Sequence, residues 1–380
     1  MDSNDSPVEN SLSKGLQALR DLLGGAWEVT LRADPTAAAR STTRHVDALV
    51  ELKPTSDGHV AQLLVDVRDG VTPRTVETEL LPKLDLLRQV NHYTSPLVIS
   101  PWISPRVQEL LREHDINYLD FTGNVSLRTP RPTIVIRTQG DARSPRSVNR
   151  RSEKATLAGP KVGRLVRLLA DVSPPYRAGE LAEAARLSLP YVSRLLGTLE
   201  DQLLIRRQGR IITTVDWVQL LRARAEQLNL LRHNPYVGMV SPNGIDATLA
   251  TLRGMTGEER GRVAVTGSYA AHSVAPLAVG GQLMLYVPHG PHTPDDLGDR
   301  LGLLRVDQGA NVLLLRAHDE VVFARTADMK GLRRVALSQL VLDCLSGPGR
   351  MPAEGEAVLT YMRTHEKSWR AAQLPDVSTV

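Results

Sequence analysis

Residues 181–207 have the sequence LAEAARLSLPYVSRLLGTLEDQLLIRR. Its apolar residues recur at the spacing of amphipathic helices and form two groups. The groups are Leu181, Ala184 and Ala185, then Val192, Leu195, Leu196 and Leu199. Between them Arg186-Leu187-Ser188 predicts a tight turn, because Ser188 can cap the second helix and Pro190 suits a first helical turn, where the backbone N–H needs no partner. The stretch therefore predicts a helix-turn-helix.

The flanking residues extend this motif on both sides. Val162–Leu169 has apolar residues at positions 162, 165, 166 and 169, which predicts a preceding helix. Downstream, Leu203–Ile205 and Ile211–Ile212 are strand-like runs around Gly209, and glycine is common at hairpin tips. We therefore predict a winged helix-turn-helix over residues 160–216.

The buried positions of the second helix determine its exposed face. With Val192, Leu195 and Leu199 turned inward, polar residues of the first turns point outward, and a recognition helix contacts bases through its N-terminal residues. An arginine there can pair bidentately with guanine, which assigns that role to Arg194. The DNA-binding residues predicted on this helix are Ser188, Pro190, Tyr191, Ser193, Arg194 and Thr198.

Positive charge concentrates around the motif. From Ala142 to Arg222 the chain has 15 Lys and Arg against 7 Asp and Glu, a net charge of 15 − 7 = +8, whereas the whole chain has +4. Such a basic segment is typical of a module that binds a polyanion. We predict DNA-backbone or minor-groove contacts for the wing residues Arg206, Arg207 and Arg210 and for the linker residues Arg150, Arg151 and Lys154. The alternatives are a solvated basic surface and a winged helix that contacts protein.

The chain, at 380 residues, is too long for one compact core. Strands interleaved with helices on both sides of the motif predict α/β layer folds, so the expected class is a multi-domain α/β protein. Residues 1–12 are polar and predict a disordered tail. The predicted boundaries are 13–140 for an N-terminal α/β domain, 141–159 for a basic linker, 160–216 for the winged helix, 217–235 for a connecting helix and 241–365 for a C-terminal α/β domain.

Hydrophobic periodicity also predicts individual elements in the α/β domains. The expected helices are Ser13–Leu23, Val76–Val90, Pro105–His114 and Ser338–Leu345, and the connecting helix covers Trp217–Leu231. The expected strands are Val46–Leu52, Val60–Val67, Leu97–Ile99, Tyr118–Leu119, Val125–Leu127, Thr133–Ile136, Arg262–Val265, Gln282–Val287, Asn311–Leu315 and Val321–Phe323.

Composition argues against several other classes of protein. Cys344 is the only cysteine, so a disulfide framework is impossible and a cysteine-based zinc site is nearly so. The start of the chain is polar and acidic, and no stretch approaches the ~18 apolar residues of a membrane span. We expect a cytoplasmic, nucleoid-associated protein with no membrane partner, no metal and no cofactor.

Three further stretches carry a family resemblance. Residues 97–127 are LVISPWISPRVQELLREHDINYLDFTGNVSL, residues 263–276 are VAVTGSYAAHSVAP, and residues 345–359 are LSGPGRMPAEGEAVL. Together with 181–207 they resemble bacterial winged helix-turn-helix regulators of the AbiEi-like group, the antitoxins of type IV toxin–antitoxin systems. The resemblance spans most of residues 40–360. It implies transcriptional autoregulation or regulation of a neighbouring operon.

The N-terminal domain also resembles restriction-endonuclease-like folds. Such nucleases hold a divalent metal with an Asp on one strand and an acidic residue of an (Asp/Glu)-x-Lys motif on the next. The corresponding residues are Asp47 and Asp66-Val67-Arg68, where arginine replaces the lysine and cannot be deprotonated. We therefore expect an inactive nuclease core and no catalytic residues.

The C-terminal domain resembles nucleotidyltransferases at its Gly267-Ser268 turn. In those enzymes two carboxylates on the following strand bind magnesium, but the strand here, Leu283–Val287, has no Asp or Glu. Gly267 and Ser268 are therefore candidates for a small-molecule pocket, with a plain tight turn as the alternative.

These observations predict a sequence-specific, double-stranded-DNA-binding transcriptional regulator without enzymatic activity. The competing hypotheses are a metal-dependent nuclease targeted by the winged helix and an antitoxin-like module that sequesters a protein. A homodimer and a small-molecule effector stay open as further partners.

Overall fold

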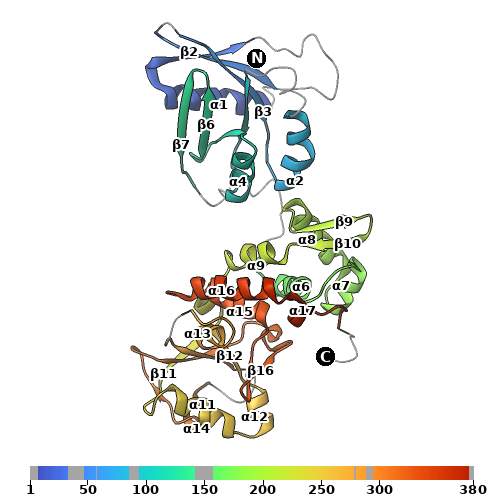
Figure 1. The fold of residues 1–380 in the computed structure, drawn as a ribbon, viewed down its shortest axis with the longest axis vertical. Helices are drawn as coiled ribbons and strands as arrows, with labels where there is room; N and C mark the ends of the chain where they lie inside the picture. Colours follow the sequence, from blue (N-terminus) through green and yellow to red (C-terminus); the bar gives the residue numbers. More distant parts are fainter. Residues whose placement is uncertain are drawn as a thin grey trace, which may run out of the picture. The chain divides into compact units, whose positions relative to one another are not determined.

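The computed structural model describes residues 7–32, 47–56, 58–84, 94–141, 157–277, 280–287 and 294–375. The chain is mixed α/β with several sheets, as the sequence predicts (Figure 1). It divides into two compact units, an N-terminal unit mainly from Met1–Lys154 and a C-terminal unit from Ala155–Glu200 and Leu204–Val380.

The N-terminal unit is built on a seven-stranded sheet whose strands lie in chain order, β1 to β7. The neighbours β3, β4 and β5 are parallel, so helical segments connect them, whereas the other neighbours are antiparallel. The strands are β1 (Trp27–Arg32), β2 (Ala48–Pro54), β3 (Ala61–Val67), β4 (Thr94–Ser100), β5 (Asn117–Asp120), β6 (Val125–Pro130) and β7 (Thr133–Thr138). The helices are α1 (Pro7–Leu23), η1 (Gly24–Ala26), α2 (Pro73–Thr75), the π-helical turn η3 (Val76–Leu80) and α4 (Pro105–Glu113).

Helices cover both faces of this sheet. Strand β4 shows the alternation, since Leu97 and Ile99 belong to a core with α1 while Val98 belongs to a second core with η3 and α4. Helix α1 approaches β4 closely at Gly15, where a Cβ would lie 2.5 Å from Ile99 Cδ1. The two cores explain why Leu97, Val98 and Ile99 are apolar on both faces of β4.

Most elements predicted in this unit are confirmed within a few residues, with three corrections. Helix α1 begins at Pro7, so residues 7–12 are helical and not part of a tail. The helix predicted for Val76–Val90 begins at Pro73, where Thr72 caps the chain, and residues 85–93 lie outside the described residues. Strand β1 was missed, because only Val29 in it is buried and the others show no apolar alternation.

The C-terminal unit begins with the helix–hairpin segment, which we define as residues 160–215. It consists of α6 (Pro160–Asp171), β8 (Tyr176–Arg177), α7 (Ala178–Ala184), α8 (Leu189–Asp201), β9 (Ile205–Gln208) and β10 (Ile211–Val215). The three strands pair in the order β8-β10-β9, and Gly209 turns the β9–β10 hairpin with φ of 60°. The helices, turn and hairpin that the sequence predicts are confirmed.

The rest of this unit is a second seven-stranded sheet in the order β14-β11-β15-β13-β12-β17-β16, flanked by helices. The strands are β11 (Tyr236–Val240), β12 (Ala264–Thr266), β13 (Leu283–Val287), β14 (Leu304–Arg305), β15 (Val312–Arg316), β16 (Ala327–Met329) and β17 (Leu332–Arg334). The helices are α9 (Trp217–Ala225), α10 (Leu230–His233), α11 (Ile245–Gly254), α12 (Gly257–Gly261), α13 (Gly267–His272), α14 (Pro294–Arg300), η4 (Glu320–Phe323), α15 (Leu337–Leu345), α16 (Met351–Thr364) and α17 (Glu366–Trp369).

One hydrophobic core joins the helix–hairpin segment to the C-terminal sheet. This core is a single cluster of buried side chains, of which Leu157 is the first in the chain and Met362 the last. Within it α6 and α9 both pack on α15. Arg167 of α6 is 2% exposed and donates to Gln339 of α15 at 2.8 Å and to the Val321 carbonyl at 3.2 Å. The helix–hairpin segment is therefore part of a larger packed body.

Two predicted elements in this unit are wrong. The single helix expected over Trp217–Leu231, within the boundary 217–235, is two helices, because the Gln227 and Leu228 N–H groups bond three residues back and Asn229 then caps α10. The strand expected at Val321–Phe323 is the 3₁₀ turn η4, because the Asp319 carboxylate accepts from Val321 N and starts a turn.

A search of the described residues found no helix with the length and apolar character needed to cross a membrane.

Candidate nucleic-acid interface

Helix α8 has a buried face that packs on the core and an opposite face that is exposed to solvent. Val192, Leu195, Leu196 and Leu199 are each 0% exposed, as predicted. On the other side Ser188, Pro190, Ser193 and Arg194 are exposed. The polar first turns of α8 are therefore free to meet a partner.

The remaining predicted residues of this helix are less available. Tyr191 is half-buried and packs against the core, and Thr198 is half-buried and its hydroxyl donates to the Arg194 carbonyl at 3.4 Å. Within the described part of the chain, the Arg194 guanidinium has no ion pair. Arg194 is thus the strongest hydrogen-bond donor that this face presents.

The hairpin carries three arginines in different environments. Arg206 and Arg210 are exposed, and Arg210 has no ion pair with any described residue. Arg207 is half-buried, and its Nε donates to Glu200 Oε2 of α8 at 2.9 Å while its Nη2 contacts the same oxygen. This pair ties the hairpin to α8, so Arg207 is not presented to a ligand in the way that Arg210 is.

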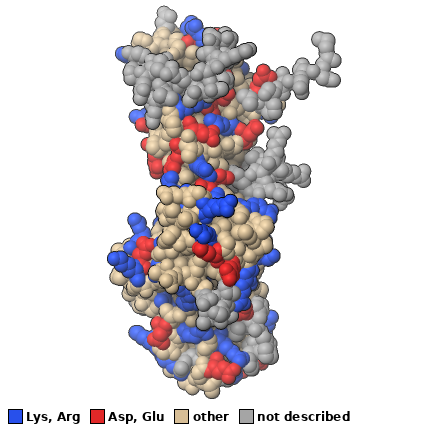
Figure 2. Space-filling model, turned by 90° about the vertical axis from the view of Figure 1, so that its right-hand side faces the viewer, with Lys and Arg blue, Asp and Glu red and all other residues tan. Residues whose placement is uncertain are grey.

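The three linker cations Arg150, Arg151 and Lys154 lie outside the described residues. Figure 2 draws one face of the molecule, and on it Lys and Arg lie interspersed with Asp and Glu. On that face the described cations form no unbroken basic surface. The basic character of the candidate interface therefore rests on the few arginines of α8 and the hairpin.

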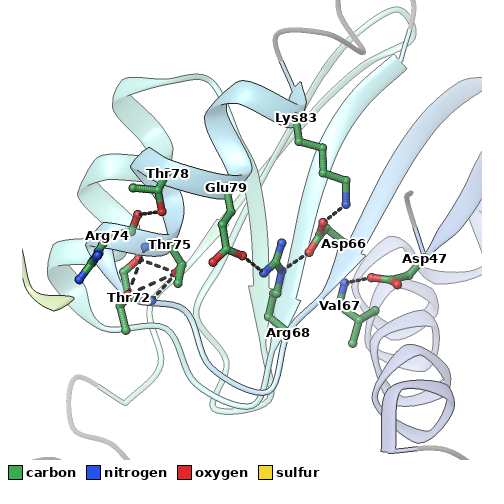
Figure 3. Close-up of polar contacts among 10 residues, drawn as sticks. All are labelled: Asp47, Asp66, Val67, Arg68, Thr72, Arg74, Thr75, Thr78, Glu79 and Lys83. Carbon is green, nitrogen blue, oxygen red and sulfur yellow. Dashed lines mark hydrogen bonds and ion pairs between the residues drawn. The ribbon is translucent and has the colours of Figure 1, made fainter. Parts of the chain in front are cut away.

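The nuclease-like residues of the N-terminal unit form a network of ion pairs (Figure 3). Asp66 at the end of β3 is 4% exposed and accepts from Arg68 Nε at 2.6 Å and from Lys83. Arg68 also donates to Glu79 at 2.6 Å. Burial, which disfavours the Arg68 cation, is outweighed by these two carboxylates, and its pKa is raised.

This network differs from a metal site. The Asp47 carboxylate accepts from the Val67 backbone N–H at 2.6 Å. Among the described residues no group of three or more His, Cys, Asp and Glu is arranged to hold a metal ion. In the described network Arg68 pairs with both Asp66 and Glu79, and Lys83 pairs with Asp66.

The turn predicted as a small-molecule pocket is internally bonded. Gly267 has φ of 67°, and a Cβ there would lie 2.9 Å from Met284 Sδ. The Ser268 hydroxyl is buried and donates to Glu354 Oε2 at 2.6 Å, and Arg350 holds the other oxygen of Glu354 at 3.0 Å. The hydroxyl that a ligand would use is already occupied.

Four partners of these residues were not singled out from the sequence: Glu79, Lys83, Glu200 and Glu354. Glu354 carried a signal, because Arg350 and Glu354 are opposite charges four residues apart and do pair. Glu79 and Lys83 have the same spacing, but the structure pairs them with Arg68 and Asp66 instead. Glu200 carried none, since its contact with Arg207 depends on how the hairpin folds back on α8.

This chain matches no protein-family model, no curated protein and no solved structure. The resemblance drawn from the sequence therefore stays a prediction.

Proposed function

We propose that this protein is a sequence-specific, double-stranded-DNA-binding transcriptional regulator and that its helix–hairpin segment is a winged helix-turn-helix. One observation carries the proposal: α8 buries Val192, Leu195, Leu196 and Leu199 and presents Ser193 and Arg194 on an exposed first half beside a hairpin with arginines. A recognition helix meets the major groove in this way.

In this proposal the parts of the interface have separate tasks. Arg194 reads guanine, Ser188, Pro190 and Ser193 contact the groove edge or the backbone, and Arg206 and Arg210 contact phosphate or the minor groove. The linker cations add phosphate contacts. Tyr191, Thr198 and Arg207 support the positions of these residues.

The proposal also includes membership of an AbiEi-like family and a nucleoid-associated location. It further includes a restriction-endonuclease-like N-terminal domain without catalytic activity and a nucleotidyltransferase-like C-terminal domain. Asp47 and Asp66 lie beside β2 and β3, as the endonuclease resemblance implies, and the ion pairs of Asp66 support loss of activity. A homodimer and an effector would be compatible with such a regulator.

The test is a comparison of matched arginine variants. Genome-wide immunoprecipitation first identifies the bound DNA, and gel-shift titrations then use a recovered site and a scrambled one. Arg194→Ala should weaken binding to the site by roughly 1–3 kcal/mol and relax specificity. Arg363→Ala, which removes the same charge from the exposed face of α16, should leave the discrimination unchanged. Unchanged affinity of Arg194→Ala for the recovered site would refute the assignment of α8.

Two results would favour the competing functions. Plasmid cleavage with Mg²⁺ or Mn²⁺ that disappears in Asp66→Ala would indicate a nuclease. A stable protein partner, together with no DNA retention at about 100 mM salt, would indicate a sequestering module.

A further inference from the structure

The C-terminal unit contains a small cavity that the proposed DNA-binding function does not use. Its volume is about 60 Å³, and it lies where α6 of the helix–hairpin segment meets the C-terminal α/β layer. Its lining includes Pro160, Gly163, Arg167, Arg224, Asp319 and Asp343.

Arg224 of α9 is a buried cation without a counter-ion. Its side chain is 4% exposed, and neither Nε nor Nη1 has a hydrogen-bond partner. In the described ranges it forms no ion pair. Burial lowers its pKa to about 10, which still leaves the guanidinium charged at neutral pH. A buried cation is costly unless something pairs with it.

The carboxylates around the cavity already have partners. Asp319 accepts from Arg164 Nε at 3.1 Å and from the Val321 N–H at 2.9 Å. Asp343 accepts from Thr266, Tyr286 and Gln339 at 2.6, 3.0 and 2.8 Å. Among the described residues no hydrogen bond joins either carboxylate to Arg224, although the Asp319 charge acts on it at longer range.

Two further features of α6 favour negative charge in this cavity. Arg167 lines it and is 2% exposed, and its Nε has no partner, although its Nη1 and Nη2 are bonded. The 12-residue helix α6 begins at Pro160, and its N-cap, Gly159, supplies no side-chain acceptor. The positive end of the helix dipole therefore lies at the cavity wall formed by Pro160 and Gly163.

The glycine in α6 makes room for the guanidinium. A Cβ on Gly163 would lie 2.9 Å from Arg224 Nη2, so any larger residue would push the arginine away. The close approach of α6 to the Arg224 guanidinium therefore requires glycine at position 163.

We propose that this cavity binds one compact oxyanion, with the chemistry of inorganic phosphate or a small carboxylate, through Arg224 and Arg167, and that the dipole of α6 adds to the positive potential there. A cavity of about 60 Å³ exceeds the roughly 10–15 Å³ that one water molecule needs and is far below the roughly 300 Å³ of a pocket for a larger ligand, so it suits a small anion and excludes a nucleotide. The cavity lining includes none of the exposed residues proposed to contact DNA and neither Gly267 nor Ser268. A bound anion would join α6, α9 and the C-terminal layer.

The experiment is a phosphate titration of the full chain at constant ionic strength, with chloride as the balancing ion. Thermal unfolding and ³¹P line broadening of the phosphate signal are measured together. The wild type should show a saturable rise of several degrees in melting temperature and a broadened signal. Arg224→Met should show neither. The matched control is Arg222→Met, which removes a half-buried arginine of α9 that pairs with Glu356 of α16, and it should keep both responses.

The outcomes separate the proposal from its alternatives. If Arg224→Met does not fold, Arg224→Gln takes its place, and ³¹P broadening reports binding independently of stability. Equal broadening in wild type and both Arg224 variants would overturn the site, as would a wild type without a saturable response. A wild type that responds to added chloride as it does to phosphate would overturn the oxyanion assignment.

Discussion

At the scale of single residues, one hairpin arginine differs from the other two. Arg207 forms an ion pair with Glu200, whereas Arg206 and Arg210 are exposed. Replacing Glu200 by Gln should release Arg207 for a phosphate contact. We expect tighter binding to non-specific DNA and a steeper salt dependence, by about 0.9 in the slope of log K against log salt for one added contact. Fluorescence anisotropy over a range of salt concentrations measures this slope. Asp201→Asn removes the same charge from the next position, and a slope change as large in that control would contradict the role of Arg207.

Asp343 should make stability depend on pH. Burial raises its pKa from 3.8 to about 6, against the opposing hydrogen bonds of Thr266, Gln339 and Tyr286 and the Arg167 charge. The folded state therefore binds the proton more tightly than the unfolded state, so stability falls as pH rises from about 4 to about 6 and is then constant, a change of roughly 3 kcal/mol.

The variant Asp343→Asn isolates this contribution. Its amide oxygen can accept from Tyr286 and Gln339, and its amide nitrogen can donate to the Thr266 hydroxyl. In urea unfolding, the wild type should lose stability relative to Asp343→Asn between pH 4 and pH 6 only. Asp246→Asn on the exposed start of α11 serves as the control. A pH-independent difference between wild type and Asp343→Asn would contradict the prediction.

At the scale of elements, the β12–α13 turn requires glycine. Gly267→Ala combines the left-handed backbone with a contact on Met284 Sδ, so we expect a loss of at least about 1–2 kcal/mol in the free energy of unfolding. Gly254→Ala in α11, where a Cβ would meet nothing within 4 Å, should instead be neutral or stabilising by up to about 1 kcal/mol. Denaturant unfolding measures the free energy of unfolding of both variants. A Gly267→Ala variant as stable as Gly254→Ala would show that the turn tolerates a side chain.

The elements also show what the sequence can predict. Helix α8 was predicted with all four of its buried residues, because period and capping signals agree there. The edge strand β16 was not predicted, since its three residues are exposed or half-buried and show no apolar pattern. At the candidate site, the exposure of Arg194 follows from the helical period. The Arg207–Glu200 pair and the Arg224 cavity depend on contacts between elements, which periodicity does not encode.

At the scale of the whole molecule, the helix–hairpin segment should not be an independent folding unit. Arg167 on α6 reaches Gln339, and Arg370 from the chain beyond α17 donates to the Ala170 carbonyl at 2.9 Å. Cutting the chain after the segment would expose the face of α6 that packs on α9 and α15. It would also remove the Gln339, Val321 and Ala324 contacts of Arg167, which would keep only its pair with Asp171 on the same helix. An exposed core face opposes folding.

Two fragments test this argument. Residues 157–375 contain the complete shared core and should unfold cooperatively, whereas residues 157–216 should show low helicity and no sharp thermal transition. Circular dichroism melts and amide chemical-shift dispersion measure both properties. If 157–216 unfolded cooperatively at the same temperature as 157–375, the segment would be an autonomous module. If the prediction holds, any change in the C-terminal layer that shifts α15 also shifts α6, so the two halves of this unit respond to a ligand as one body.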